Sequence, residues 1–167
     1  MVIVGIIGEL GTGKTLTLTY MAEAKFRRKG IKVFANYGYK NRHKFIKKPD
    51  MLDTIKNGCV ALDEVWLWMD SRNFATKGNK VIGKILLKSR RRGLDIMYTA
   101  QSFDQVEKRL RNVTDILIYP ELSPKMQYCY AKAYARFSGA MLYTIKFKCK
   151  PVFKLYDHRE ELDYLEV

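Results

Sequence analysis

Short apolar runs alternate with longer amphipathic stretches over the first two thirds of the chain. The apolar runs predict β-strands, and the amphipathic stretches predict helices because their apolar side chains recur at helical spacing. Regular alternation of strand and helix favours parallel strands joined by helices that cover both faces of a sheet. The predicted strands are residues 2–7, 31–35, 59–63, 94–99 and 115–119, and the predicted helices are residues 14–29, 50–55, 79–92 and 103–110.

The last third of the chain has a different pattern, in which apolar and polar residues alternate at every second position. This alternation over residues 126–131 and 141–150 is typical of half-exposed strands, and Gly139 lies between the two segments. We therefore expect an antiparallel hairpin, extended by a third strand over residues 152–156. One face of the second strand is apolar, and the other face carries Lys146, Lys148 and Lys150.

These patterns predict an α/β fold with a mainly parallel sheet, helices on both faces and a C-terminal antiparallel β extension. A chain of 167 residues is long enough for one domain with a substantial core. We expect a single domain over residues 1–167, with the parallel core in residues 1–122 and the antiparallel β extension in residues 123–157.

Basic residues are in clear excess. The chain has 31 Lys and Arg against 17 Asp and Glu, a formal net charge of +14. This excess favours a polyanionic partner, nucleic acid before a membrane surface, although a generally basic proteome would also explain it. Cys59, Cys129 and Cys149 lack metal-ligand spacing and predict buried thiols rather than a zinc site. No apolar run is as long as a membrane span and no signal peptide is visible, so we expect a cytoplasmic protein without stable membrane insertion.

A glycine-rich segment directly follows the first predicted strand and precedes the first predicted helix. Its spacing matches the phosphate-binding loop pattern G-x-x-x-x-G-K-[ST] in full. Glycines let backbone N–H groups turn toward phosphates, and the positive end of the helix dipole adds to this attraction. Lys14 would contact the outer phosphates and Thr15 would contact Mg²⁺, so the segment predicts ATP and Mg²⁺ as ligands. The predicted nucleotide-binding residues are Gly8, Glu9, Leu10, Gly11, Thr12, Gly13, Lys14, Thr15 and Leu16.

Two adjacent carboxylates lie where the predicted strand 59–63 ends. Asp63 is expected to hold Mg²⁺ beside Thr15, and Glu64 is expected to orient and activate the attacking water. A nucleotide hydrolase needs this second carboxylate and a kinase does not, so the pair favours hydrolysis. The alternative is a strand end that faces solvent and has no role in chemistry.

Gln101 follows the predicted strand 94–99, at the edge of a parallel sheet where ligands bind. Its amide can donate to phosphate and accept from water, which suits a γ-phosphate sensor; a local cap of the strand end is the alternative. Two arginine clusters nearby include Arg91, Arg109 and Arg111. At least one of these clusters is expected to have a catalytic or intersubunit role, such as an arginine finger, although a solvated helix end explains any single arginine as well.

Aromatic and basic residues are mixed between positions 36 and 48, as in surfaces that stack bases and contact phosphates. A solvated loop would have nearly the same composition. Arg72, Lys77 and Lys80 follow the carboxylate pair and are candidates for lining a DNA channel. The mixed residues are Tyr37, Tyr39, Lys40, Arg42, His43, Lys44, Phe45, Lys47 and Lys48.

Several motifs beyond the phosphate loop occur together in this chain. They are LDEVWLWMDSR at residues 62–72, SRRRGLDI at residues 89–96, TAQ at residues 99–101 and FKLYD at residues 153–157. With these motifs the chain resembles the HerA/FtsK clade of P-loop ATPases over most of residues 1–157. Within that clade it looks most like the Zot-like ATPases and the DNA-packaging ATPases of archaeal viruses and plasmids.

The resemblance implies a RecA-like (ASCE) P-loop core, a homo-oligomeric ring of hexameric or pentameric form, and ATP-driven movement of DNA, which we expect to be double-stranded. It also implies family roles for Lys14, Thr15, Asp63, Glu64 and Gln101. Capsid or other assembly proteins are the implied partners, in the host cytoplasm or in association with the virion or assembly site. Zot proteins carry a membrane segment and an extra C-terminal domain that this sequence does not show, which favours a motor outside the membrane.

The resemblance also bears on the arginine finger. The FtsK branch places its finger just before the last core strand, where this chain has Arg109 and Arg111 ahead of a strand that begins with Asp115. The identity of the finger therefore stays open among the arginines.

The function that fits best is an ATPase that translocates DNA to package the genome of a virus or mobile element. One alternative is a nucleotide-gated assembly or DNA-transfer factor with little turnover. The other is a small-molecule kinase, for which a water-activating Glu64 would be counterproductive. Phosphate release without any acceptor would separate the hydrolase from the kinase.

Overall fold

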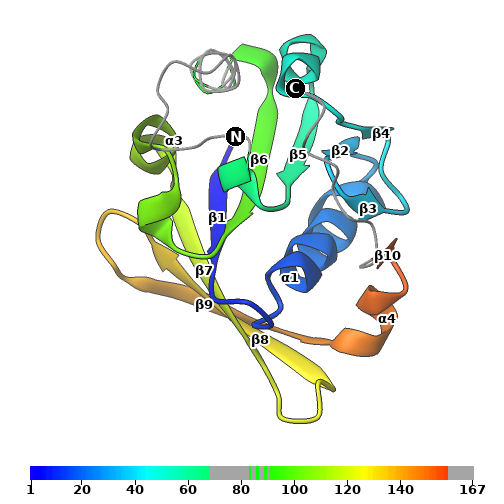
Figure 1. The fold of residues 1–167 in the computed structure, drawn as a ribbon, viewed down its shortest axis with the longest axis vertical. Coiled ribbons are helices and arrows are strands. Elements are labelled where there is room, and N and C mark those ends of the chain that lie inside the picture. Colours follow the sequence, from blue (N-terminus) through cyan, green and yellow to red (C-terminus); the bar gives the residue numbers. More distant parts are fainter. Residues whose placement is uncertain (68–82, 84–85, 87–88, 90, 158–167) are drawn as a thin grey trace.

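Eight strands form one continuous sheet in the order β4-β2-β5-β6-β1-β7-β8-β9 (Figure 1). The structure is a computed structural model that describes residues 1–67, 83, 86, 89 and 91–157. Its strands are β1 (Ile3–Ile7), β2 (Val33–Ala35), β4 (Lys44–Phe45), β5 (Gly58–Leu62), β6 (Leu94–Ala100), β7 (Ile116–Leu122), β8 (Tyr128–Ala135) and β9 (Met141–Lys148).

Neighbouring strands are parallel along the part of the sheet that runs β4-β2-β5-β6-β1-β7. The last two pairs, β7 with β8 and β8 with β9, are antiparallel. Strand β1 is central and pairs with both β6 and β7. Every residue of β1 and of β5 is buried, as expected for parallel strands that are covered on both faces. The prediction of a mainly parallel sheet with a C-terminal antiparallel extension is confirmed.

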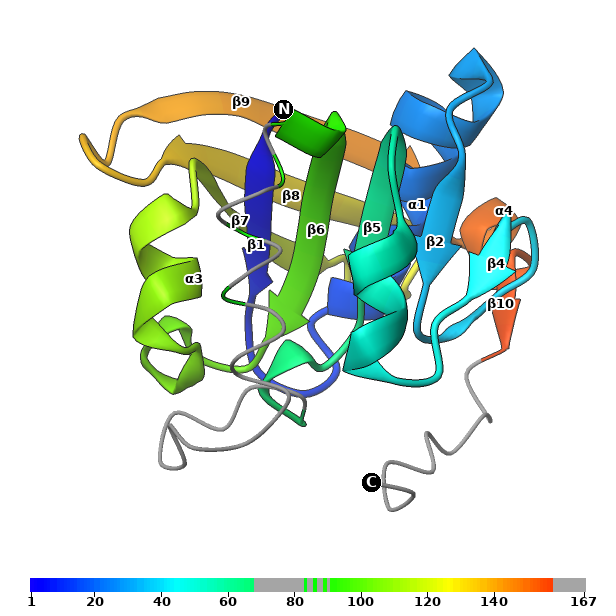
Figure 2. The ribbon, with the colours of Figure 1, turned by 90° about the horizontal axis from the view of Figure 1, so that it is seen from above.

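Helices cover both faces of the parallel strands (Figure 2). On one face, α1 (Lys14–Met21) packs through Leu16, Leu18 and Met21 into a core that also contains Ile6 of β1. On the other face, α3 (Lys108–Val113) contributes Leu110, and the 3₁₀ helix Pro49–Thr54 contributes Leu52, to a second core. Burial of these apolar stripes stabilises the layered arrangement, because each helix covers a face that water would otherwise contact.

Strands β8 and β9 curl over α1, so that this helix lies between them and the parallel strands (Figures 1 and 2). The face of β8 that contacts α1 carries small residues, namely Cys129, Ala131 and Ala133, all fully buried. Further along, the rings of Tyr20 and Phe147 stack with their centroids 4.1 Å apart. Small side chains on β8 permit this close approach, and the larger tyrosines of β8 therefore lie on the opposite face.

The third strand predicted over residues 152–156 is wrong. Residues Cys149–Phe153 form the short helix α4, and strand β10 (Tyr156–Asp157) pairs with β3 (Gly38–Tyr39) instead of extending the hairpin. Cys149 and Val152 are the buried residues of α4, and a spacing of three is helical. Pro151 also lacks the N–H group that a strand would need for its ladder.

Two predicted helices are interrupted. The stretch 14–29 is α1 followed by a π-helical turn (Ala22–Phe26) and a 3₁₀ turn (Arg27–Lys29), and Gly30 ends it with the expected left-handed backbone at φ 77°. The stretch 103–110 is a 3₁₀ turn (Phe103–Gln105) and then α3, which Glu107 caps by accepting a hydrogen bond from the Arg109 N–H. Within the predicted helix 79–92, the described residues 83, 86, 89, 91 and 92 are helical.

The three cysteines are buried free thiols, as predicted. In the described part of the chain, no helix is both long and apolar enough to cross a bilayer.

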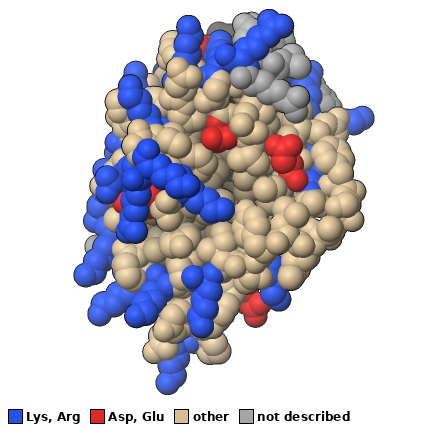
Figure 3. Space-filling view, turned by 180° about the vertical axis from the view of Figure 1, so that it is seen from behind, with Lys and Arg blue, Asp and Glu red and all other residues tan. Residues whose placement is uncertain are grey.

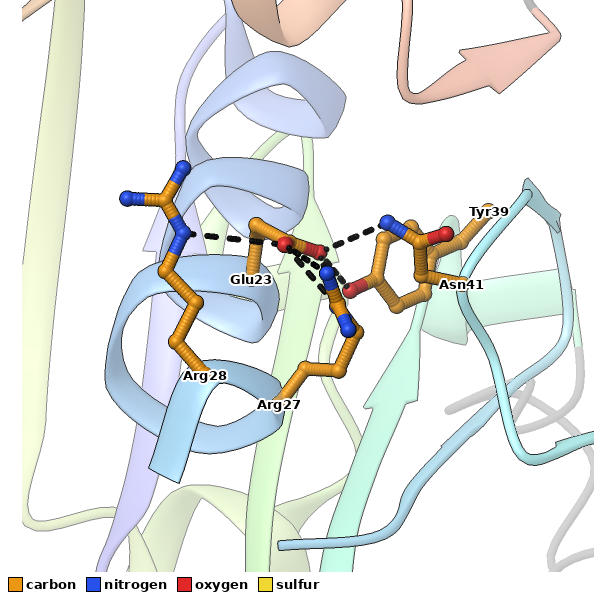
Figure 4. A network of polar contacts seen from close by, with 5 residues as sticks. All are labelled: Glu23, Arg27, Arg28, Tyr39 and Asn41. Carbon is orange, nitrogen blue, oxygen red and sulfur yellow. Dashed lines mark hydrogen bonds and ion pairs between the residues drawn. The ribbon is translucent and has the colours of Figure 1, made fainter. Parts of the chain in front are cut away.

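A buried carboxylate ties the π-helical turn after α1 to the loop that follows β2 (Figure 4). Glu23 accepts hydrogen bonds from the Tyr39 hydroxyl at 2.6 Å, from Asn41 Nδ2 at 3.0 Å and from Arg27 Nε at 2.8 Å. Arg28 approaches the same carboxylate from solvent at 3.7 Å. Burial alone would raise the pKa of Glu23, but the hydrogen bonds from Tyr39, Asn41 and Arg27 outweigh it and lower this pKa below its ordinary value.

Replacing Glu23 by glutamine is expected to lower the free energy of unfolding by about 1–3 kcal/mol at neutral pH, because the hydrogen bonds to a charged acceptor are lost. A lowered pKa contributes stability that is complete above the ordinary glutamate value of 4.5 and declines as the pH falls through the pKa of the folded state. Urea unfolding at neutral and at acidic pH measures this, and the difference between the two proteins should shrink in acid. Arg28→Gln is the matched control, since this exposed partner should contribute less than about 1 kcal/mol. A difference that is independent of pH would contradict this account.

Candidate nucleotide-binding site

The segment from Gly8 to Thr15 connects the end of β1 to the start of α1, as predicted. Gly11 and Gly13 adopt left-handed backbone conformations, with φ of 78° and 95°. A Cβ atom at Gly13 would lie 3.0 Å from Leu122 Cδ2, and one at Gly8 would lie 2.6 Å from Thr12 Oγ1. Glycine is therefore required both by backbone conformation and by close packing, which is the condition for a loop whose N–H groups surround a phosphate.

Lys14 is the first residue of α1, and its side chain is buried. Its Nζ donates a hydrogen bond to the carbonyl oxygen of Glu9 at 2.9 Å, and the Thr12 hydroxyl donates to the same oxygen at 2.9 Å. The ammonium group thus lies across the loop, next to the helix N-terminus, where N–H groups lack intrahelical acceptors. Glu9 and Leu10 are exposed, and Leu16 is a core residue that can contribute to a ligand only through its backbone.

Asp63 follows β5 directly and lies against the start of α1. The Thr15 hydroxyl donates to the two carboxylate oxygens of Asp63 at 3.1 and 3.0 Å, although 48 positions separate the two residues. The Thr99 hydroxyl donates to the same carboxylate at 2.6 Å. The Asn36 side chain forms two hydrogen bonds with the backbone of Asp63. Its Nδ2 donates to the Asp63 carbonyl oxygen, and its Oδ1 accepts from the Asp63 N–H.

The Asp63 carboxyl is nine-tenths buried or more, and this burial raises its pKa above the ordinary value even though the Thr99 and Thr15 hydroxyls act to lower it. A cation beside Asp63 would offset the cost of desolvation and favour the charged form. Thr15 and Asp63 are oxygen ligands of the kind that Mg²⁺ accepts together with phosphate oxygens and water. Within the described residues no cluster of three His, Cys, Asp or Glu side chains could hold a metal ion by itself.

Glu64 has a left-handed backbone conformation, with φ of 50°. Its N–H donates to the Thr99 hydroxyl at 2.8 Å, so Thr99 joins the backbone of Glu64 to the carboxylate of Asp63. The Trp66 indole N–H donates to the Glu64 carboxylate. A non-glycine residue in this conformation is uncommon and is often found at active sites.

Gln101 is half-buried and follows the last residue of β6, whose carbonyl accepts a hydrogen bond from the Gly8 N–H at 3.3 Å. It therefore lies next to the first glycine of the loop. Arg109 and Arg111 extend from α3 and pair with Glu107 at 3.7 Å and Asp104 at 3.5 Å. Arg109 also lies against Gly83, because a Cβ there would be 2.9 Å from its guanidinium. Arg91 is exposed. The structure thus brings Lys14, Thr15, Asp63 and Glu64 together, with the arginines on other elements.

The loop between β2 and β5 only partly matches the surface predicted from its composition. Tyr37 and Tyr39 are buried, so neither offers a ring to a nucleic-acid base. Arg42 lies over the ring of Phe45 at 4.8 Å. Within residues 36–48 the exposed basic residues are Lys40, His43, Lys44, Lys47 and Lys48. The predicted channel residues Arg72, Lys77 and Lys80 lie outside the described residues.

Sequence reasoning missed two residues of this site, Thr99 and Asn36. Both lie at or just beyond the carboxyl ends of strands that neighbour β5, which is the position that led us to Gln101. Applied to every predicted parallel strand, the same rule would have found them.

Solved structures with the same fold support this view of the architecture. The N-terminal domain of zonular occludens toxin from Neisseria meningitidis aligns with a TM-score of 0.66 and 24% sequence identity, covering 93% of this chain and 98% of that chain. The genome packaging NTPase B204 from Sulfolobus turreted icosahedral virus 2, in complex with ATP-gammaS, aligns with a TM-score of 0.61 and 12% identity, covering 84% and 95%. The fold is that of a P-loop NTPase.

Curated phage proteins are similar in sequence. The Gene 1 protein of Enterobacteria phage I2-2 is 26% identical over 137 residues, and that of Escherichia phage If1 is 28% identical over 138 residues; both alignments cover 66% of this chain. The chain spans only 37% and 38% of the length of these relatives. The family model described as zonular occludens toxin (Zot) matches residues 39–160. Because this match covers well over half of the sequence, the chain belongs to the Zot family.

Proposed function

We propose that this protein hydrolyses ATP with Mg²⁺ and uses the energy to move DNA during the assembly of a phage or virus. The observation that supports this most directly is the contact between the Thr15 hydroxyl and the Asp63 carboxylate beside Lys14. It brings a phosphate-loop hydroxyl, a buried acid and a cation together from elements far apart in sequence. A glycine-rich turn that matched the phosphate-loop pattern only by chance would not be expected to form this contact.

In the proposed site, the backbone N–H groups of the loop and the start of α1 bind the phosphates, and Lys14 contacts the outer ones. Thr15 and Asp63 would hold Mg²⁺, which, when bound, neutralises charge on the outer phosphates. Thr99 and Asn36 fix the orientation of Asp63 through its carboxylate and its backbone. This arrangement binds the nucleotide and polarises it toward attack.

Glu64 is the proposed base that accepts the proton of the attacking water. The hydrogen bond from its N–H to Thr99 fixes its backbone next to Asp63, so that its side chain can move without displacing the metal-holding acid. Gln101 would orient the same water from the end of β6 and contact the outermost phosphate. Arg91, Arg109 or Arg111 would act on the nucleotide of a neighbouring subunit in a homo-oligomeric ring.

DNA is the proposed load. The net charge of +14 supports a polyanionic partner, and Figure 3 shows Lys and Arg gathered on the side of the molecule where Figure 1 places β3, β4 and α4. One structural neighbour is named a genome packaging NTPase, and the sequence relatives are phage proteins. These likenesses support a role in phage or virus assembly, with capsid or other assembly proteins as further partners.

The test is phosphate release from ATP, measured with Mg²⁺ or with a chelator and in the presence or absence of DNA. We expect Mg²⁺-dependent release without any acceptor molecule, and a higher rate when DNA is added at low salt. Release only with a small-molecule acceptor would instead identify a kinase. A rate that stays the same with DNA across a salt series would count against translocation.

One contact favours a second candidate, a nucleotide-gated assembly factor with little turnover. The Trp66 indole donates to one oxygen of the Glu64 carboxylate, and while this contact holds, that oxygen of the proposed base is not available to water. Tight ATP binding with negligible phosphate release, and with no response to DNA, would support this candidate over the motor.

A further inference from the structure

The outer face of β7 and β8 carries a row of tyrosines. Because neighbouring residues of a strand point to opposite faces, the buried Cys129, Ala131 and Ala133 place Tyr128, Tyr130 and Tyr134 on the face that turns away from α1. Tyr119 of β7, opposite Lys132 of β8, lies on the same face and is 43% exposed. We call these four residues, Tyr119, Tyr128, Tyr130 and Tyr134, the tyrosine face.

The tyrosine face borders a pocket of about 390 Å³, which is within the usual range of small-molecule sites. Tyr119 and Tyr134 line it, and their rings meet edge to face with centroids 5.9 Å apart. Arg136 also lines the pocket, with its guanidinium 5.7 Å from the Phe103 ring and 4.7 Å from the Phe137 ring. Its Nε is buried and has no hydrogen-bond partner among the described residues.

Exposed lysines lie among the tyrosines. Lys132 of β8, and Lys146 and Lys148 of β9, share this face because the register places Tyr130 opposite Lys146 and Tyr128 opposite Lys148. The Lys146 ammonium lies 4.8 Å from the ring centroid of Tyr128 and 5.3 Å from that of Tyr130. The exposed acid among the described residues of this face is Glu121, so basic charge predominates.

We propose that the tyrosine face binds single-stranded DNA, with bases stacked on the tyrosines and phosphates paired with Lys132, Lys146, Lys148 and Arg136. This rests on the proposed movement of DNA and specifies its strandedness. Alternate residues of a strand lie roughly 7 Å apart, so the half-buried Tyr128, Tyr130 and Tyr134 place a series of partly exposed rings along β8. Sheets that combine exposed aromatic rings with basic residues bind single strands in this way.

Stacking decides between single-stranded and double-stranded DNA. In a duplex the bases are stacked on each other, so only the phosphates would reach this surface and the rings would contribute little. An unpaired base can cover a tyrosine ring while its phosphate contacts the adjacent lysine. The tyrosine face therefore fits a single strand better than the duplex expected from the resemblance.

The test is fluorescence anisotropy with labelled oligothymidylate, compared with a labelled duplex of the same length. Tyr134→Leu keeps an apolar side chain but removes the ring, and should weaken oligothymidylate binding roughly five- to hundredfold. Tyr134→Phe keeps the ring and should bind like the parent protein. Phe153→Leu, on α4 outside the tyrosine face, is the matched control and should bind normally.

The lysines are tested by the salt dependence of binding. Lys146→Gln should lower the slope of log affinity against log salt by about 0.7, the value for one phosphate contact to a single strand. Lys108→Gln, an exposed lysine of α3 away from β3, β4 and α4 and not on the tyrosine face, should leave the slope unchanged. Equal losses in the two variants would mean that binding depends on net charge and not on this face.

Three other results would overturn the proposal. The first is tighter binding of the duplex, and the second is an equal effect of Tyr134→Leu and Tyr134→Phe on binding. The third is a change in the sedimentation of Tyr134→Leu relative to the parent protein, which would identify this face as a contact between copies of the chain. Failure of the proposed function is separable, because Lys14→Ala should lose ATP hydrolysis and still bind oligothymidylate. If the parent protein hydrolysed no ATP while Tyr134→Leu still lost binding, the tyrosine face would stand and the motor would not.

Discussion

Replacing Glu64 by glutamine is expected to lower ATP turnover about a hundredfold or more while nucleotide binding is retained. The amide has nearly the same size and still accepts a hydrogen bond from Trp66, but it cannot take a proton from water. The backbone bond between the Glu64 N–H and Thr99 does not involve the changed group and should persist. Phosphate release measures turnover, and titration with a fluorescent ATP analogue measures binding.

The control for this variant is Asp50→Asn, which neutralises an exposed carboxylate at the 3₁₀ helix Pro49–Thr54. It removes the same charge from the protein and should leave turnover unchanged. If Glu64→Gln kept most of the parent turnover, Glu64 would not be the base. If the variant instead lost nucleotide binding, the residue would have a structural role in the site.

The second large effect is expected for Lys14→Ala, which should reduce turnover by roughly a hundred- to a thousandfold and also weaken nucleotide binding. The buried ammonium lies at the start of α1 and is the charge that the loop can offer to the outer phosphates. Its loss removes attraction for the nucleotide in the ground state and for the charge that develops during transfer. The same two assays apply, with a matched control at Lys154.

Lys14→Ala and Glu64→Gln should differ in a way that identifies the two roles. The lysine variant should fail at binding and at turnover, whereas the glutamate variant should fail at turnover alone. Full activity in both variants would show that the nucleotide site has been assigned to the wrong residues. Lys154→Ala, an exposed position, should behave like the parent protein in both assays.

The parallel core could be predicted because its strands are apolar on both faces, and because Gly30 and Gly93 end the helical stretches that precede β2 and β6. Helix α4 could not be predicted with the same rule. The spacing between Cys149 and Val152 is helical, but the residues before them alternate with a period of two, and the strand pattern was extended too far. The π-helical turn after α1 has no sequence signal in this chain, since the apolar pattern runs through it.

The candidate site was predictable where chemistry depends on spacing along the chain, as for Lys14 and Thr15. The role of Asp63 was predictable because acids at the end of an apolar strand, in a chain with a phosphate loop, indicate a carboxylate that holds the metal. Tyr37 and Tyr39 show the limit of composition, since their rings are buried and their hydroxyls bond Thr19 and Glu23. Only tertiary packing decides whether an aromatic ring faces solvent. The arginine finger, the ring and the wider HerA/FtsK relationship stay predictions.

The position of α1 has a mechanical consequence. Its Thr17 hydroxyl lies 3.4 Å from the sulfur of Cys129 in β8, and Tyr20 stacks on Phe147 in β9, so the helix that begins at the phosphate loop is in close contact with two strands. A shift of α1 relative to these strands would require the stack and the packing beneath it to separate. Helix α1, β8 and β9 should therefore move together as one rigid body. A displacement of the phosphate loop at the start of α1 would then also displace the outer surface of β8 and β9.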